Sequence, residues 1–249
     1  MKKITAVLLI LTLLVGCAAT AEVPTPTAAT PAETTSASAI PTPTVPPTPE
    51  PVPTPDRGDL TEEQAEQVNR AFSAHENPEY DADFMAVSGF FTSYYADVRE
   101  LDFAEFLWYY PSDGGVGEEE FAALVELPGF YWGKEYFTEN NLPLVPQSLP
   151  VPTCRILRSS VDETLKKYAG ITTADLKNTD NTLYLPEYDA YYTFTSDFGP
   201  GSFTCEGGRV EEDTAVLWSE ERQGFRKELT LQKEGEDWCI QSFLLVTVP

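Results

Sequence analysis

A proline-rich run between residues 21 and 55 limits how much of this 249-residue chain can fold. In this run 11 of the 35 residues are proline, most of the others are Thr, Ala or Ser, and none is aromatic. Such a segment buries too little apolar surface to offset the entropy lost on ordering. Frequent proline favours extended polyproline II, at about 3.1 Å per residue, so the run can reach roughly 100 Å. We expect a disordered tether, the alternative being a proline-rich ligand for a recognition domain, and a globular part over residues 56–249.

The residues before the tether have the pattern of a secretory signal. Two lysines precede a nearly unbroken apolar stretch over residues 4–15, which is shorter than the about 20 residues that a membrane-spanning helix needs. Residues 14–17 read Leu-Val-Gly-Cys, which resembles the lipobox of bacterial lipoproteins. The resemblance implies a signal peptide over residues 1–16, cleavage before Cys17, and diacylglycerol with acyl chains such as palmitate on that cysteine.

Lipidation of Cys17 implies a location on the outer face of the cell membrane, with residues 17–55 as a lipidated tether and the remainder extracellular. The alternatives are an ordinary signal peptide cut elsewhere, or an uncleaved helix with an incidental cysteine. No other stretch of the sequence is apolar and long enough to suggest a second membrane span.

The charge of the chain restricts its partners. Its formal charge is −24, and removal of Lys2 and Lys3 with the signal peptide makes it −26. Such an acidic chain is unsuited to nucleic acid or to direct adsorption on anionic lipid, because both carry negative charge. It suits a solvated extracellular domain, or one that meets cations or basic partners. Aromatic residues make up 12% of the chain and all follow the tether, which is ample material for a core.

Three cysteines remain after lipidation: Cys154, Cys205 and Cys239. An exported setting permits one disulfide and leaves one thiol over. We favour a Cys205–Cys239 disulfide because both residues fall in predicted strands of one sheet; the alternative is that all three are reduced and buried. Their spacing, with a single histidine in the chain, matches no recognised zinc site.

Residues 59–127 have helical periodicity. Thr61 and Gln64 form a capping-box pattern at the start of a helix that ends near residue 74. A second helix is expected from about residue 81, a third after the capping residue Asp102, and a fourth over residues 118–126. Residues 128–152 hold five prolines and several aromatics, and we expect an irregular hinge there.

Residues 153–249 are mixed and rich in strand patterns. A short strand is expected at Thr153–Leu157, followed by a helix with a capping box at residues 160–163 and an end at Gly170. From residue 182 onward short turns separate alternating segments, which predicts an antiparallel meander. The expected strands are Leu183–Leu185, Tyr188–Ser196, Ser202–Cys205, Thr214–Ser219, Phe225–Gln232 and Trp238–Val246.

Helices followed by an antiparallel sheet predict an α+β fold with the N-terminal helices packed on the meander. The element order resembles the cone of nuclear-transport-factor-like (NTF2-like) domains. Residues 94–111, 120–124, 161–172 and 187–192 are similar to a set of uncharacterised lipoproteins from Gram-positive gut bacteria. That resemblance implies location and no assigned activity. Those relatives tend to have a histidine where this chain has Cys154, which counts against a catalytic or metal-binding role for the position.

The sequence offers little catalytic chemistry. Its one histidine, His75, is expected at a helix end, where a cap or surface role suits it. There is no Gly-x-Ser-x-Gly elbow and no phosphate-binding glycine loop, so no cofactor is expected. Residues 178–189 loosely resemble a calcium loop but lack its turn glycine and its terminal glutamate, so a solvated turn is favoured and no metal is expected.

Two surfaces are candidate binding sites. Asp189 and Asp197 flank Tyr191 on a predicted strand, a combination that a sugar-binding face or a glycosidase would use. Tyr131 and Trp132 lie in the aromatic loop of residues 130–137. We expect a non-catalytic binding module for envelope polymer, solute or another surface protein. The alternatives are a cell-surface glycan hydrolase that uses paired carboxylates, and a structural accessory subunit with no small ligand.

Overall fold

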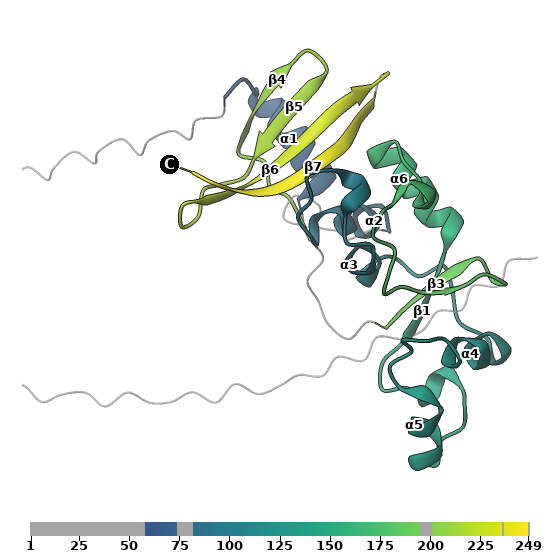
Figure 1. The fold of residues 1–249 in the computed structure, drawn as a ribbon. Coiled ribbons are helices and arrows are strands. Elements are labelled where there is room, and N and C mark those ends of the chain that lie inside the picture. The colour runs from purple at the N-terminus through teal and green to yellow at the C-terminus, as the bar shows by residue number, and fades with distance from the viewer. Residues whose placement is uncertain (1–57, 74–81, 195–200, 236, 249) are drawn as a thin grey trace, which may run out of the picture. The chain divides into compact units, whose positions relative to one another are not determined.

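The computed structural model describes residues 58–73, 82–194, 201–235 and 237–248, and it confirms the α+β class (Figure 1). The helices are α1 (Glu62–Phe72), α2 (Ala82–Ser88), α3 (Phe103–Trp108), α4 (Glu118–Val125), α5 (Gly133–Glu139) and α6 (Arg158–Ala169). The strands are β1 (Thr153–Leu157), β2 (Leu183–Leu185), β3 (Ala190–Phe194), β4 (Gly207–Glu211), β5 (Thr214–Trp218), β6 (Phe225–Glu234) and β7 (Asp237–Thr247). Short 3-10 helices are η1 (Gly89–Phe91), η2 (Val98–Glu100), η3 (Pro146–Ser148) and η4 (Thr173–Asp175). In this part of the chain no helix is both long and apolar enough to cross a membrane.

Two predicted helix starts are confirmed. The Thr61 hydroxyl accepts a hydrogen bond from the Gln64 N–H at 3.2 Å, and the Gln64 side chain accepts one from the Thr61 N–H at 2.9 Å. Asp102 likewise accepts from the Glu105 N–H at 3.1 Å and begins α3. These side chains satisfy N–H groups that have no partner within the helix.

The capping box predicted at residues 160–163 is wrong. Helix α6 begins at Arg158, directly after β1, so Ser160 lies inside the helix. Its hydroxyl donates to the Asp113 carboxylate at 2.9 Å and does not cap the helix. The predicted end is confirmed, since Gly170 caps α6 with a left-handed φ of 67°.

The strands form two sheets, where the sequence predicted one meander. The orders are β1-β3-β2 and β4-β5-β6-β7, and neighbouring strands are antiparallel. The predicted strand Ser202–Cys205 is absent, because the Asn69 side chain takes the backbone groups of Cys205: its amide donates to the Cys205 carbonyl at 3.0 Å, and its oxygen accepts from the Cys205 N–H at 2.6 Å. After Cys205, strand β4 begins only at Gly207.

The region predicted to be irregular, residues 128–152, contains α5 and η3. Helix α5 is stabilised by Phe137, which is buried and meets Phe121 of α4 edge-on at 5.8 Å between ring centroids. Aromatic packing therefore gives this proline-containing segment a helix that its composition does not indicate.

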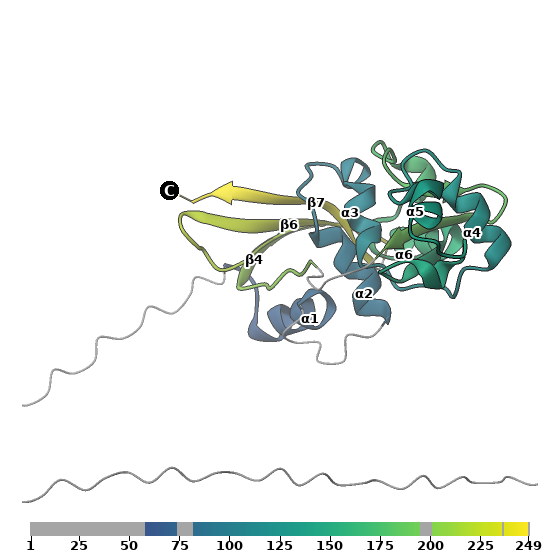
Figure 2. The same cartoon turned by 90° about the horizontal axis from the view of Figure 1, so that it is seen from below.

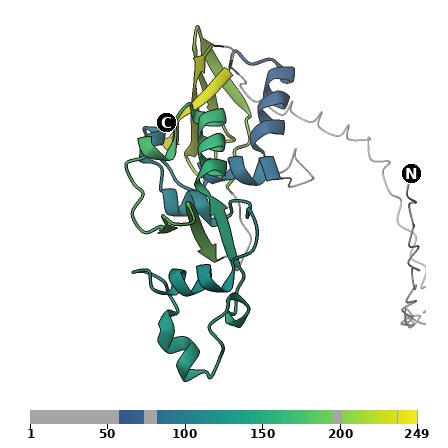
Figure 3. The ribbon, with the colours of Figure 1, turned by 90° about the vertical axis from the view of Figure 1, so that its right-hand side faces the viewer.

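Two hydrophobic clusters fill the interior, and the three-stranded sheet contributes to both. Ile156 and Tyr191 share one face of that sheet and pack with residues of α2, α3 and α6 and with the inner face of the four-stranded sheet. Tyr192 and Ala190 on the opposite face pack with α4 and α5. Figure 2 shows α1 and α2 beside the four-stranded sheet, and Figure 3 shows α4 and α5 grouped near β3. The three-stranded sheet is therefore covered on both faces.

The chain joins the four-stranded sheet at Gly58, on its β4 edge. Gly58 forms a parallel bridge with Gly208, and the Asp59 N–H donates to the Gly208 carbonyl at 2.8 Å. Gly58 has a left-handed φ of 61°, and a Cβ there would lie 2.3 Å from the Gly208 oxygen. Glycine is thus required by both conformation and space.

The Cys205–Cys239 disulfide predicted from the sequence is wrong: Cys239 is a buried free thiol on β7. Cys205 precedes β4, so the two residues lie at opposite edges of the four-stranded sheet. Three strand spacings separate them by roughly 14 Å, twice the Cα separation of about 7 Å that a disulfide can bridge. Burial, together with the charges of Glu234 and Asp237, raises the pKa of the Cys239 thiol.

Candidate functional site

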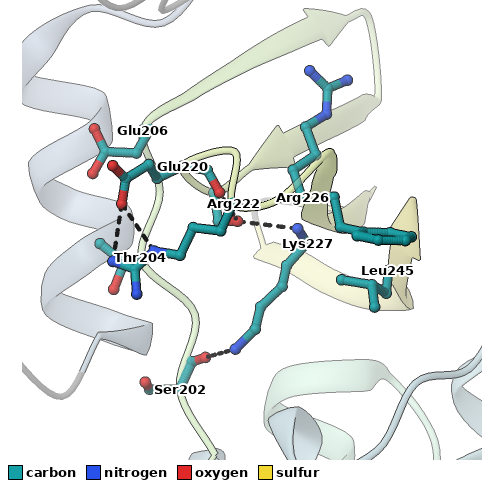
Figure 4. Close-up of a pocket in the computed structure, with 10 residues that line it drawn as sticks. Ser202, Thr204, Glu206, Glu220, Arg222, Arg226, Lys227 and Leu245 are labelled. Carbon is teal, nitrogen blue, oxygen red and sulfur yellow. Dashed lines mark hydrogen bonds and ion pairs between the residues drawn. The ribbon is translucent and has the colours of Figure 1, made fainter. Parts of the chain in front are cut away.

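An open pocket of about 450 Å³ lies where β6 and β7 extend beyond the hydrophobic cluster (Figure 4). Leu229 and Phe243, a register pair on the inner face, are almost fully buried. Two residues further along this face, Lys227 pairs with Leu245. Leu245 is 49% exposed and Phe225, at the start of β6, is 46% exposed. The same alternation that builds the core therefore supplies apolar walls that nothing in the described chain covers completely.

Lys227 is the central cation of this pocket. Its ammonium donates to the Ser202 carbonyl at 3.3 Å and lies 5.9 Å from the centroid of the Phe243 ring. Burial lowers the pKa of Lys227, and the nearby charge of Arg222 lowers it further, with no carboxylate acting in the opposite direction. Within the described residues, no ion pair neutralises this half-buried ammonium. It is therefore partly desolvated without a compensating negative charge.

The other two cations of the pocket have carboxylate partners. Arg222 binds the Glu220 carboxylate at 2.9 and 3.0 Å. Arg226 binds Glu228 at 2.6 Å and lies over the Trp218 ring, 4.8 Å from its centroid. In Figure 4 the Arg226 side chain points away from the Lys227 ammonium. These pairs leave Lys227 as the cation best placed to receive an anion.

The remaining polar groups shape the pocket around Lys227. The Ser219 hydroxyl accepts from the Lys227 backbone N–H at 3.0 Å and donates to the Glu220 carbonyl at 3.1 Å, so it supports the strand. Glu206 also lines the pocket, and Figure 4 shows its carboxylate beside Glu220, on the opposite side from the Lys227 ammonium. The pocket thus has an acidic and a basic side, and apolar walls at the basic side.

Of the predicted pair of carboxylates, the structure describes only Asp189. Asp189 accepts two hydrogen bonds from Arg158, at 2.6 and 3.1 Å, and one from the Tyr184 hydroxyl at 2.6 Å. These bonds, that from Arg158 first, lower the pKa of Asp189. Its carboxylate is therefore engaged in holding the β2–β3 turn to α6. Asp197 and His75 lie outside the described residues.

The predicted aromatic residues occupy separate places. Tyr191 is buried and meets Phe103 edge-on at 5.0 Å, which leaves its ring no face for a ligand. Trp132 packs against Phe194 at 4.8 Å. Tyr131 is 86% exposed and borders a crevice of about 150 Å³ beside α3. That crevice contains neither Asp189 nor Tyr191, so the two predicted surfaces do not form one site.

Lys227 was missed from the sequence, although a signal was present. In β6, residues 225, 227, 229 and 231 alternate with polar neighbours and read Phe, Lys, Leu and Leu. Strand periodicity places these four side chains on one face. A lysine in an otherwise apolar row indicates a buried or half-buried cation, which is uncommon unless it is paired or functional.

No family model, curated protein or solved structure matches this chain. The NTF2-like arrangement therefore stays a prediction. Among the described residues, no group of three or more His, Cys, Asp and Glu side chains is placed to hold a metal ion.

Proposed function

We propose that this chain is an exported lipoprotein, anchored through Cys17 on the outer face of a bacterial cell membrane, and that its globular part is a binding module. The signal-like N-terminus, the Leu-Val-Gly-Cys sequence and the proline-rich tether support the anchor and the location. The partners are the membrane, through lipid, and a ligand from the cell envelope or its surroundings.

The observation that carries the binding function is the half-buried ammonium of Lys227, bound at the Ser202 carbonyl in a pocket that Phe225 and Leu245 also line. Removing a charge from water without a counter-ion is unfavourable, and binding of an anion offsets this desolvation cost. The adjacent apolar side chains add favourable contact for a hydrocarbon group. The preferred ligand therefore combines a carboxylate or another anion with an apolar part.

The negative charge of the whole chain makes this preference selective. A chain of charge −24 repels polyanions at long range. A ligand with a single anionic group experiences little of this repulsion at physiological ionic strength, where the Debye length is about 8 Å. The expected ligand is thus a small or mostly uncharged molecule with one acidic group.

The ligand class is tested by calorimetric titration of the full chain in detergent with N-acetylphenylalanine and with its amide, which lacks the carboxylate. We expect the acid to bind about tenfold more tightly than the amide, because a charge-assisted hydrogen bond contributes about 1.5 kcal/mol or more. Lys227→Met should remove this preference. Lys233→Met, which changes an exposed lysine of the same strand, is the matched control. Equal binding of acid and amide would refute the anion site.

The anchor is tested separately by Cys17→Ser. This change removes the thiol that lipidation requires, so we expect the protein to move from the membrane fraction to the soluble fraction. Cys154→Ser is the control and should leave the protein in the membrane. Retention of the Cys17→Ser variant in washed membranes would contradict the lipoprotein assignment.

A further inference from the structure

The free edge of the four-stranded sheet lies beside this pocket. β7 is the last strand in the order β4-β5-β6-β7. At Phe243 its edge is occupied, because the Phe243 N–H donates to the Tyr95 carbonyl at 2.9 Å and its own carbonyl accepts from the Tyr95 N–H at 2.8 Å. Backbone groups in an antiparallel strand alternate between the two sides. Those of Leu245 and Thr247 therefore face the same way as those of Phe243.

The even-numbered residues of β7 support this assignment, because their backbone groups point to the other side. The Val248 N–H donates to the Gly224 carbonyl at 2.9 Å, toward β6. Residues 244 and 246 have the same parity as Val248 and thus face β6, and residues 245 and 247 face outward. No other described strand lies along this side of β7. Leu245 and Thr247 together offer two N–H donors and two carbonyl acceptors to an additional strand.

Residues 243–247 carry neither the charge nor the proline that commonly prevents an edge from pairing with another chain. Natural edges are protected by lysine, proline, bulges or short length. Residues 243–247 read Phe-Leu-Leu-Val-Thr, without charge or proline. The only irregularity in the β6–β7 register lies further up, between Thr230 and Leu231. The edge is also bordered by exposed apolar side chains: Leu245, Phe225 and Tyr94, which is 50% exposed and stacks on Phe243 at 5.2 Å.

The charge of the pocket identifies the occupant. Lys227 is the register partner of Leu245, so its strand lies one spacing of about 4.8 Å behind the open edge. A chain added to β7 would place alternate side chains, or its terminal carboxylate, on the face from which Lys227 projects. A second copy of this chain is disfavoured because two copies of charge −24 repel each other.

We propose that β7 takes an extended peptide of another protein as a fifth strand, with apolar residues against Tyr94, Leu245 and Phe225 and one carboxylate at Lys227. This inference rests on the proposed anion site and names its ligand class. Backbone hydrogen bonds at Leu245 and Thr247 supply affinity that does not depend on sequence, and the pocket supplies selectivity. A peptide that is otherwise neutral or basic suits the acidic chain.

The first test measures binding of fluorescent Val-Lys-Val-Lys-Val, with an acetylated N-terminus and a free C-terminal carboxylate, to the full chain in detergent by anisotropy. Two further peptides carry N-methyl groups on the valines or on the lysines. In a paired strand only one of these two sets of amides faces β7. We expect one methylated peptide to lose roughly tenfold or more in affinity and the other to retain it. Equal affinity of the two would overturn strand addition.

The second test changes the edge itself. Leu245→Pro deletes an outward N–H that β6 does not use, and proline is tolerated at such edge positions. We expect it to weaken peptide binding roughly fivefold or more, whereas Leu245→Ala, which retains the N–H, weakens it less. Circular dichroism and the midpoint of urea unfolding show whether the proline variant is folded. If it is not, the methylated peptides decide alone.

The outcomes separate this inference from the proposed function. Binding of N-acetylphenylalanine without binding of any peptide would overturn strand addition and leave the anion site intact. Binding of neither would overturn both. If sedimentation shows a concentration-dependent dimer that Leu245→Pro abolishes, a second copy occupies the edge and the proposal is wrong.

Discussion

In the three-stranded sheet both faces are buried, whereas the four-stranded sheet is buried on its inner face and leaves an end and an edge uncovered. The polar groups differ accordingly. Beside the smaller sheet, Glu120 is buried and accepts from the Tyr192 hydroxyl at 2.5 Å, and Asp189 is bound by Arg158. Beside the larger sheet, no carboxylate among the described residues pairs with Lys227. Polar groups that are already paired serve the fold, and an unmatched cation at an uncovered end is available to a ligand.

The largest expected difference concerns packing. Ile156→Ala removes a fully buried side chain from the smaller sheet, between the two hydrophobic clusters. We expect the free energy of unfolding to fall by about 3 kcal/mol, as for other buried Ile→Ala changes. Leu245→Ala in the larger sheet should cost less than about 1 kcal/mol, because that side chain is half exposed. Urea unfolding measures both, and similar losses would remove the contrast between the sheets.

A second prediction compares one cation from each sheet. Arg155 lies 3.7 Å from the buried Glu120 carboxylate, so Arg155→Met leaves that carboxylate with one partner fewer. We expect a loss of about 2 kcal/mol. Lys227→Met should instead increase the free energy of unfolding by about 0.5 kcal/mol, because it removes a desolvated charge. Opposite signs in the two unfolding curves support the comparison, and a destabilised Lys227→Met variant would contradict it.

The smallest effect is a pH dependence at Asp189. Its pKa is lower in the folded chain than the unfolded value of about 3.9, since Arg158 and Tyr184 bind the carboxylate. The resulting stabilisation is fully present above pH of about 4 and is lost as the pH falls through the lower folded pKa. Asp189→Asn should therefore unfold less steeply with acid over this range than the natural chain. If the free energies of unfolding of the variant and the natural chain changed in parallel with pH, the ion pair would add nothing to stability.

Local signals predict the helix starts at Thr61 and Asp102 and most of the strands, because each of these features depends on neighbouring residues. The caps at Thr61 and Asp102 and the alternation in β5, β6 and β7 are of this kind. The absence of a strand at residues 202–205 was not predictable, because it depends on Asn69 bonding to Cys205, 136 residues away. The same limit applies to the site.

The candidate site was likewise only partly predictable from the sequence. Residue type alone favours Asp189 and Tyr191 as ligand-binding residues, yet Arg158 and Phe103, distant in sequence, already contact them. Lys227 was detectable as a cation in an apolar row of β6. Its significance depends on where the covering helices end and on Ser202 lying 3.3 Å from its ammonium. Strand periodicity shows on which face of the sheet a side chain lies, but not how far other residues bury it.

The bridge between Gly58 and Gly208 has a mechanical consequence. A pull transmitted along the residues before Gly58 enters the folded part beside β4, at the opposite edge of the sheet from β7. The backbone bond from Asp59 to Gly208 and the contacts of Leu60 and α1 would carry that load first. Tension on this segment would thus loosen the β4 edge before it disturbed β7, the strand that we propose binds the peptide. The contacts that would bear tension and the strand that we propose binds the peptide therefore lie at opposite edges of one sheet.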